Sequence, residues 1–380
     1  VTKNGWIVIN EEKIQDFGSM DSCPESSGQS VLDADGGMVI PAWCDSHTHL
    51  VFARSREREF EDRIKGLSYQ EIAENGGGIL NSVEKLRNMS ENELLEQSWS
   101  RLQQVMHMGT GAIEIKSGYG LNKESELKML RVIRSLKKKS PVPIKTTLLA
   151  AHAVPTEFAE NKKGYVQHII DEMIPEVAGE NLADYIDIFC EKGYFDVDDT
   201  DKLLTAGNKY GLIPKIHVNQ FNAFGGVKIA VNHDALSVDH MEMMNKEDLE
   251  VLENSKTIVT ALPSCSFFLK IPYTPARKII GSNVPLALAT DYNPGSTPSG
   301  NMNFVMSLAC IQMNMTPNEA LAAGTINGAA AMNLSDITGS IEVGKLANLI
   351  ITKPADSLAY LPYSFGHSHV EQVIINGKVL

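Results

Sequence analysis

Eight short apolar segments alternate with amphipathic segments along the middle of this 380-residue chain, and this alternation limits the fold more than any other feature. Most of the apolar segments are rich in aliphatic or β-branched residues and have the length of buried parallel strands. The amphipathic segments carry helix-start signals, such as the capping boxes formed by Ser90 with Glu93 and by Thr316 with Glu319. The predicted strands are 38–46, 112–116, 144–150, 185–190, 213–218, 235–238, 257–261 and 286–289.

This pattern predicts an α/β protein with a (β/α)8 TIM-like barrel. An open doubly wound sheet is the main alternative, but it usually has fewer strands and a glycine-rich phosphate turn, which this sequence lacks. The two chain ends hold short strand-like segments and turns instead, at 6–10, 347–352 and 373–376. We expect residues 1–36 and 344–380 to form one small β-sandwich domain, and residues 37–343 to form the catalytic barrel.

Charge and cysteine content limit the partners and the location of the protein. The net charge of −13 argues against nucleic acid or an anionic membrane surface as the main partner. The five cysteines are sparse and form no Cys-x-x-Cys motif, and no signal peptide or membrane-spanning stretch is evident, so we expect a cytoplasmic protein. Because the chain opens at Val1 and runs at once into a strand-like segment, we expect its natural N-terminus to be missing. A homodimer is expected from the general prevalence of two-fold assemblies.

Histidines and one aspartate gather at the ends of the predicted strands, where barrel enzymes build their sites. His47-Thr48-His49 follows the first strand, and residues two apart in a strand point to the same side, so two imidazoles project together. A lone histidine at a strand end usually has a structural role. Here, however, five of the ten histidines lie at strand ends, which predicts a site for Zn²⁺ or Fe²⁺. The other strand-end residues of this kind are His152, His217, His240 and Asp291.

This arrangement resembles the amidohydrolase superfamily, in which such ligands lie on the first, fifth, sixth and eighth strands. The segment 339–349 resembles that superfamily's return into its small β domain. Four further segments, 52–57, 114–120, 150–155 and 290–296, are similar to the imidazolonepropionase family within it, and the similarity spans roughly residues 30–350. The resemblance implies hydrolysis of the cyclic amide C–N bond of 4-imidazolone-5-propanoate to N-formimino-L-glutamate, a step of histidine degradation.

The resemblance also implies how the metal ion is held. One divalent ion, Zn²⁺ or Fe²⁺, is expected on His47, His49, His217 and Asp291. Many members of the superfamily use a carbamylated lysine at the end of the fourth strand to bridge two ions. Here that strand offers Cys190 and Glu191, so we expect a single ion. Such an ion would lower the pKa of water towards ~7 and make hydroxide available at neutral pH.

Asp291, His240 and Gln220 are the predicted catalytic residues. Asp291 is expected to bind the metal and to accept a proton from the attacking water, and His240 to polarise the ring carbonyl or orient the water. Relatives typically carry an acidic residue soon after the fifth-strand histidine. The run here is His217-Val218-Asn219-Gln220, and the amide of Gln220 can hydrogen-bond the ring nitrogens but cannot accept their proton.

The substrate propionate requires a cation, and Arg56 is predicted to bind it because a guanidinium matches a carboxylate in two contacts. Lys116 is a competing candidate, although we expect it to pair with Glu114 inside the barrel. The glycine-rich segment 75–78 is predicted to be a lid, with a helix-terminating loop as the alternative. We expect the pair His367 and His369 to have an ordinary surface or packing role. The resemblance places six further residues around the substrate: Tyr119, His152, Gln220, Asn293, Gly295 and Ser296.

Two other functions stay open at this point. Another cyclic amidohydrolase, or a purine or pyrimidine aminohydrolase, would keep the same metal ligands but would not need Arg56. A barrel that binds a metal ion or a ligand without catalysis is the second alternative. The presence of Asp291 and His240 argues against that second possibility.

Overall fold

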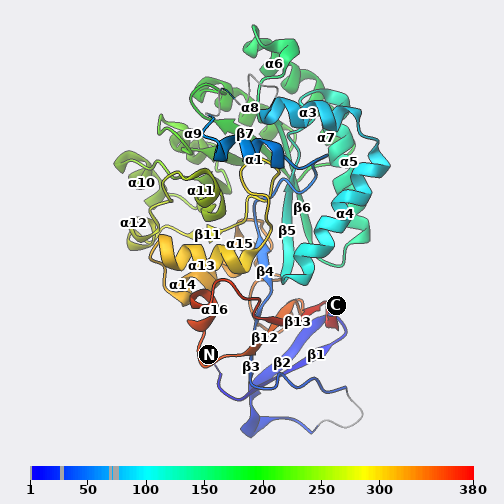
Figure 1. Cartoon of the computed structure of the whole chain (residues 1–380), viewed down its shortest axis with the longest axis vertical. Coiled ribbons are helices and arrows are strands. Elements are labelled where there is room, and N and C mark those ends of the chain that lie inside the picture. The colour runs from blue at the N-terminus through cyan, green and yellow to red at the C-terminus, as the bar shows by residue number, and fades with distance from the viewer. Residues whose placement is uncertain (1, 26–29, 68–70, 72–76) are drawn as a thin grey trace.

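The computed structural model describes residues 2–25, 30–67, 71 and 77–380. Eight parallel strands hydrogen-bond to one another in chain order, from β4 to β11, and helices surround them (Figure 1). The predicted α/β barrel is therefore confirmed. Its strands are β4 (Trp43–Asp45), β5 (Thr110–Lys116), β6 (Ile144–Ala151), β7 (Tyr185–Cys190), β8 (Ile213–Val218), β9 (Ser237–His240), β10 (Ile258–Ala261) and β11 (Leu286–Leu288).

The first and last barrel strands meet just beyond their C-terminal ends. Thr48 forms an isolated parallel bridge with Tyr292. The backbone N–H of Asp291 donates to the carbonyl of His47 at 3.0 Å, and the N–H of His49 donates to the carbonyl of Tyr292 at 2.9 Å. The barrel thus closes through the same short segments that carry the predicted metal ligands, which holds those ligands in a fixed relation to one another.

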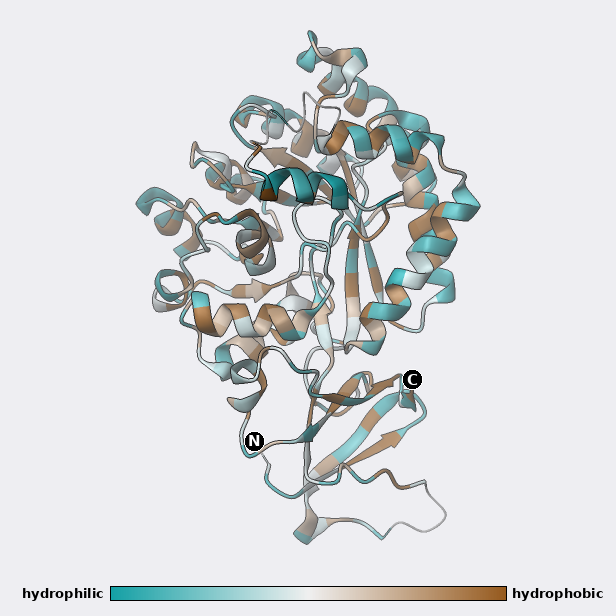
Figure 2. Cartoon of the chain, in the orientation of Figure 1, coloured by the Kyte–Doolittle hydropathy of each residue, from teal (hydrophilic) through white to brown (hydrophobic). Residues whose placement is uncertain are grey.

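The helices cover the barrel with one apolar side. In α5, for example, Leu127, Leu130 and Ile133 are buried, and Figure 2 shows hydrophobic and hydrophilic residues side by side along α4 and α5. Ser90 and Thr316 accept the backbone N–H of Glu93 and Glu319 at the starts of α4 and α14, and at α14 the side chain of Glu319 completes the predicted capping box. No helix in the described part of the chain is long and apolar enough to cross a membrane. The helices of eight or more residues are α1 (Glu57–Ile64), α3 (Gly78–Asn88), α4 (Glu91–His107), α5 (Lys123–Lys139), α8 (Val197–Lys209), α10 (Lys246–Glu253), α13 (Met302–Gln312) and α14 (Pro317–Gly324).

Shorter helical segments complete the barrel region and the connection to the last strands. A π-helical turn, η3 (Ile169–Met173), joins α6 to α7. The short elements are η1 (Met20–Ser22), η2 (Thr156–Phe158), α6 (Lys162–His168), α7 (Ile174–Gly179), α9 (Gly226–Asn232), α11 (Pro263–Leu269), α12 (Ala276–Gly281), α15 (Ile326–Ala330) and α16 (Tyr360–Tyr363).

Both chain ends combine into a small β unit below the barrel, as predicted (Figure 1). β1 (Gly5–Asn10) pairs antiparallel with β2 (Lys13–Ser19). A second antiparallel sheet has the order β14-β13-β12-β3. Ile14 of β2 lies in one apolar cluster with Leu349, Ile351 and Ile374 of that sheet, so apolar burial joins the two sheets. The remaining strands are β3 (Gly37–Pro41), β12 (Leu349–Pro354), β13 (Val370–Ile375) and β14 (Lys378–Val379).

The predicted strand 38–46 is in fact two strands that belong to different sheets. β3 pairs with β12 in the terminal sheet, whereas β4 pairs with β5 in the barrel, and Ala42 lies between them. The apolar run continues from β3 through Ala42 into β4, so the sequence gave no sign of this transfer. The division after residue 36 therefore comes too early, and we propose that the barrel domain begins at Ala42.

The described part of the glycine-rich segment 75–78 and the histidine pair His367 and His369 lie outside the barrel strands. Of the predicted lid at 75–78, residues 75 and 76 lie outside the described residues, while Gly77 is the N-cap of α3 and Gly78 is its first residue. His367 and His369 both contact Ser364, at 3.0 and 3.2 Å. Neither belongs to a cluster of potential metal ligands within the described ranges.

Candidate metal centre

Three imidazoles converge at the C-terminal mouth of the barrel. His47 and His49 follow β4, His217 lies in β8, and their ligand atoms lie within 4.8 Å of one another. Nε2 of His49 is 3.3 Å from Nε2 of His217. Asp291 Oδ1 lies 3.6 Å from Nε2 of His47 and 3.5 Å from Nε2 of His49. The structure thus brings together the four residues that the sequence suggested as metal ligands.

These four side chains fit a divalent metal ion. Ligand atoms around a tetrahedral Zn²⁺ at the usual bond lengths lie about 3.4 Å apart, close to the separations above. Burial lowers the pKa of His47, His49 and His217 well below 6.5, so all three are neutral near pH 7, the form that binds metals. Among the described residues, Nε2 of His47 has no hydrogen-bond partner although it is buried. A metal ion would satisfy that nitrogen.

Two buried carboxylates orient these histidines from behind. Nδ1 of His47 donates to Asp239 Oδ2 at 2.6 Å, and Nδ1 of His217 donates to Asp187 Oδ2 at 2.8 Å. Because a carboxylate can only accept, the proton stays on Nδ1 and each Nε2 keeps its lone pair for a metal. Sequence reasoning missed both roles. The available signal was an aspartate inside an apolar strand, since a buried charge needs a partner.

A lysine joins these carboxylates into one network. Lys116 Nζ lies 2.7 Å from Glu114 Oε1, 2.9 Å from Asp187 Oδ2 and 3.5 Å from Asp239 Oδ2. Burial opposes its charged form, but the three carboxylates prevail and raise the pKa of Lys116 above its usual value. Lys116 therefore pairs with Glu114, as expected, and is enclosed below the site. Lys215 is a second buried cation on Glu114.

His240 and Asp291 lie on left-handed backbone at the ends of β9 and β11. Their φ angles are 84° and 56°, which cost energy in a non-glycine residue and are common at functional sites. The ring of His240 is 5.4 Å from that of His217, between centroids. Its Nδ1 donates to Glu242 Oε1 at 3.3 Å. Burial opposes protonation of His240, but Glu242 outweighs it and raises the pKa. Burial also raises the pKa of Asp291 to about 6.

Tyr119 and His152, two of the predicted substrate-contact residues, lie beside the converging histidines. The rings of His49 and His152 stack with centroids 5.1 Å apart, and Tyr119 lies 5.6 Å from His152. Nδ1 of His152 donates to the carbonyl of Gly118 at 3.1 Å. Gly118 has φ +111°, and a Cβ there would meet His152 Nδ1 at 2.9 Å, so only glycine lets the imidazole approach.

The loop after β11 brings Asn293, Gly295 and Ser296 to the same place. Asn293 Oδ1 accepts the N–H groups of Gly295 and Ser296, at 2.8 and 2.7 Å. Ser296 Oγ donates to Asp291 Oδ2 at 3.3 Å. Asn293 therefore shapes the loop, and Ser296 contacts the predicted catalytic carboxylate directly.

Arg56 reaches this loop but already has an acidic neighbour. A Cβ on Gly295 would lie 2.3 Å from Arg56 Nη1, so the guanidinium rests against the glycine. Arg56 donates from Nε and Nη2 to Glu59 Oε2, at 2.8 and 2.7 Å. Sequence reasoning missed Glu59, although glutamate three residues after an arginine is a common helix pair. Gln220 is buried and donates to Cys265 Sγ at 3.4 Å.

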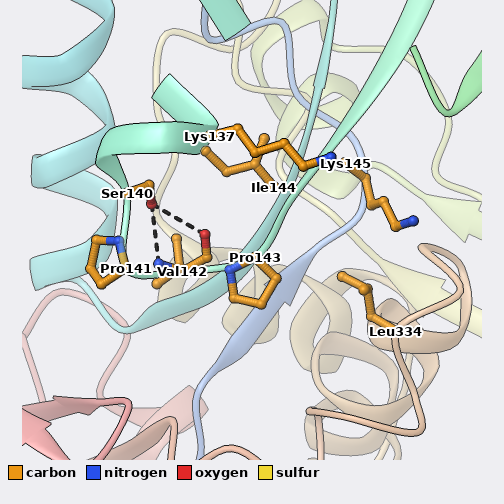
Figure 3. Close-up of a pocket in the computed structure, with 8 residues that line it drawn as sticks. All are labelled: Lys137, Ser140, Pro141, Val142, Pro143, Ile144, Lys145 and Leu334. Carbon is orange, nitrogen blue, oxygen red and sulfur yellow. Dashed lines mark hydrogen bonds between the residues drawn. The ribbon is translucent and has the colours of Figure 1, made fainter. Parts of the chain in front are cut away.

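A surface pocket at the far end of β6 contains none of the predicted site residues. Figure 3 shows hydrogen bonds between Ser140 and Val142 there, beside Ile144, the first residue of β6. The side chains that line the pocket are Lys137, Ser140, Pro141, Val142, Pro143, Ile144, Lys145 and Leu334. The predicted metal ligands lie at the opposite, C-terminal end of the barrel strands.

Known proteins with the same fold include several deaminases. Adenosine deaminase from Xanthomonas campestris, solved with bound zinc, superimposes with a TM-score of 0.74 at 16% identity. The superposition covers 99% of this chain and 88% of the deaminase chain. 5-Methylcytosine deaminase from Klebsiella pneumoniae, solved with 5-fluorocytosine, gives 0.78 at 15% identity and covers 98% and 93%. At these identities the likeness supports the barrel fold alone.

Sequence relatives are far more similar. The model of the "Amidohydrolase family" matches residues 93–380. Imidazolonepropionases from Christiangramia forsetii and Flavobacterium johnsoniae are each 59% identical over 378 residues, which is 100% of this chain and 92% of each relative. That from Fusobacterium nucleatum is 43% identical over 382 residues, with 100% and 92% covered. This chain therefore belongs to the amidohydrolase family and, within it, to the imidazolonepropionases.

Proposed function

We propose that this enzyme hydrolyses the ring C–N bond of 4-imidazolone-5-propanoate to N-formimino-L-glutamate, a step of histidine degradation. The observation that carries the proposal is the convergence of His47, His49, His217 and Asp291, with Arg56 against Gly295 in the loop that follows Asp291. Relatives at 56–59% identity over nearly the whole chain are named imidazolonepropionases. A purine or pyrimidine aminohydrolase would need the same metal ligands but no cation for a propionate.

The four converging residues would hold one Zn²⁺ or Fe²⁺ ion, because three imidazoles and a carboxylate suit both. The Xanthomonas campestris adenosine deaminase, which has the same fold, was solved with zinc, so Zn²⁺ is the first ion to test. Such an ion would supply Lewis-acid activation of water and of the ring carbonyl. Elemental analysis of the purified protein decides between the two metals.

The protein's own groups position the reactants and move the protons. Asp291 takes the proton that the attacking water loses, and Ser296 holds its second oxygen at 3.3 Å. His240 donates a hydrogen bond from Nδ1 to Glu242, and its other ring nitrogen polarises the ring carbonyl oxygen of the substrate. Gln220 can donate to or accept from the ring without removing its proton, so Asp291 delivers the proton to the departing ring nitrogen.

The propionate binds the guanidinium of Arg56 where it rests against Gly295. Glu59 holds Nε and Nη2 of the same group, which fixes its plane before the substrate arrives. Both side chains are only 8% exposed, so water screens the added carboxylate little. Pre-orientation lowers the entropy lost when the substrate binds.

Steady-state kinetics of Arg56→Gln tests this function, with Arg54→Gln as the matched control. Arg54 is exposed and two residues away. Loss of a charge-assisted contact of about 1.5–3 kcal/mol should raise KM for imidazolone propanoate roughly 10- to 150-fold. The control should keep its KM. An unchanged KM in Arg56→Gln, or hydrolysis of a purine or pyrimidine in place of the imidazolone, contradicts the assignment. Absence of any metal-dependent hydrolysis supports a non-catalytic barrel instead.

A homodimer in the cytoplasm, with no nucleic acid or membrane partner, stays part of the proposal. It is supported by the prevalence of two-fold assemblies and by the sparse, unpaired cysteines. Light scattering coupled to size exclusion measures the assembly state directly.

A further inference from the structure

A second group of potential metal ligands lies next to the first centre and shares none of its proposed ligands. One ligand atom each from His240, Glu242 and Cys265 lies within 4.8 Å of the other two, and all three residues are buried. His240 ends β9, Glu242 follows it by two residues, and Cys265 lies in the first turn of α11. Three different strong donor types therefore meet at one buried point.

The carboxylate of Glu242 is the poorly satisfied member of this group. Among the described residues, Glu242 Oε2 is buried without a hydrogen-bond partner. Its other oxygen accepts two long hydrogen bonds, each 3.3 Å, from His240 Nδ1 and Ser266 Oγ. A buried carboxylate normally takes several short hydrogen bonds, because leaving an oxygen bare costs free energy. This half-bare carboxylate faces a thiol and an imidazole, and that is the arrangement of a metal site.

The donor chemistry selects the kind of ion. When the thiol is ionised, Glu242 and Cys265 together carry two negative charges, which balance a divalent cation, while His240 can be neutral. A thiolate favours Zn²⁺ and Cd²⁺ over Mg²⁺ and Mn²⁺. Three protein ligands leave one coordination position for water.

We propose that His240, Glu242 and Cys265 form a second site for a thiophilic divalent ion, which inhibits the enzyme when it is filled. The ion takes one ring nitrogen of His240 and the carboxylate of Glu242, which otherwise holds the Nδ1 proton of His240. His240 then can no longer polarise the substrate carbonyl. The inhibition rests on the proposed function of His240, whereas binding of the ion does not.

Cadmium titration provides a readout that is independent of activity. The first centre contains no thiol, so a cadmium–thiolate charge-transfer band in the ultraviolet must come from elsewhere. A Cys23→Ser background removes the exposed thiol that would otherwise contribute. In that background we expect the band to appear on titration, and to be lost when Cys265→Ser is added. Cys310→Ser is the matched control, because Cys310 is half-buried and outside both ligand groups, and it should keep the band.

Metal content and inhibition complete the experiment. At excess Zn²⁺, equilibrium dialysis should find two ions per chain in the Cys310→Ser control and one after Cys265→Ser. The zinc concentration that halves activity should rise at least about 100-fold in Cys265→Ser, since loss of a ligand should exceed the effect of losing a supporting contact. Mg²⁺ should not inhibit.

Two outcomes overturn the proposal. One is a single zinc ion per chain at excess metal in the Cys23→Ser background. This measurement does not depend on whether any further variant folds. The other is an unchanged cadmium band after Cys265→Ser. If two ions bind but no imidazolone is hydrolysed, the proposed function fails while the second site stands.

Discussion

Replacing Asp187 by asparagine should weaken metal binding without changing any of the proposed ligands. Asp187 Oδ1 accepts the backbone N–H of His217 at 3.0 Å, and Oδ2 accepts from His217 Nδ1 at 2.8 Å and from Lys116 Nζ at 2.9 Å. Both oxygens are therefore acceptors. In asparagine one of them becomes an NH₂ donor, so either orientation of the amide places a donor against a donor.

The size of the effect follows from what this carboxylate does for His217. It keeps the proton on Nδ1 and makes Nε2 more basic, and loss of such a contact usually costs 10- to 100-fold in metal affinity. That is about 1.4–2.7 kcal/mol. Lys116 keeps Glu114 and Asp239 as partners, so the chain should still fold.

The assay is competition for Zn²⁺ against a chromophoric chelator, with circular dichroism to verify folding. Asp184→Asn is the control, because Asp184 lies three residues earlier and is 25% exposed, and its carboxylate pairs with Lys145 at 3.0 Å. Its metal affinity should equal that of the wild type. A folded Asp187→Asn protein that binds Zn²⁺ as tightly as Asp184→Asn would refute the orienting role.

Two further substitutions follow from the packing around the site. Gly295→Ala should raise KM roughly 10- to 100-fold, because the added Cβ would lie 2.3 Å from the Arg56 guanidinium and displace it. Gly281→Ala is the control and should leave KM unchanged, because a Cβ there would have no atom within 4 Å. Equal KM values in the two variants would contradict the placement of Arg56. Lys116→Met should cost about 3–5 kcal/mol of unfolding free energy in urea, because it strands buried carboxylates. Lys145→Met, at a partly exposed pair, should cost no more than about 1 kcal/mol, and a similarly small loss for Lys116 would argue against a charged lysine in the barrel.

The barrel and its strand-end residues could be predicted because both depend on local signals. Seven of the eight predicted strands correspond to single barrel strands, with bounds that differ by at most two residues and that coincide for 213–218 and 185–190. Each is an apolar run of suitable length bounded by polar residues. His217 and Asp291 then fall at strand ends simply because those ends share one face of a parallel barrel.

The partners of those residues could not be predicted because they depend on which strands are neighbours. Asp187 and His217 lie 30 residues apart and meet only because β7 pairs with β8 in one register, with Phe189 opposite His217. His47 and Asp239 come from β4 and β9, on opposite sides of the sheet order. No periodicity within a single strand contains that information. The same holds for Ala42, where the chain changes sheets without a change in hydrophobicity.

The charge balance under the site explains why this network exists. Three buried carboxylates, those of Glu114, Asp187 and Asp239, contact the ammonium groups of Lys116 and Lys215, and a fourth, that of Asp291, lies beside His47. When all six are ionised, these groups alone carry a net charge of −2 with little access to water, which is costly. A divalent cation on the neutral histidines supplies the missing two positive charges. The buried lysines and carboxylates therefore form one electrostatic unit behind the histidines that would hold a divalent metal ion.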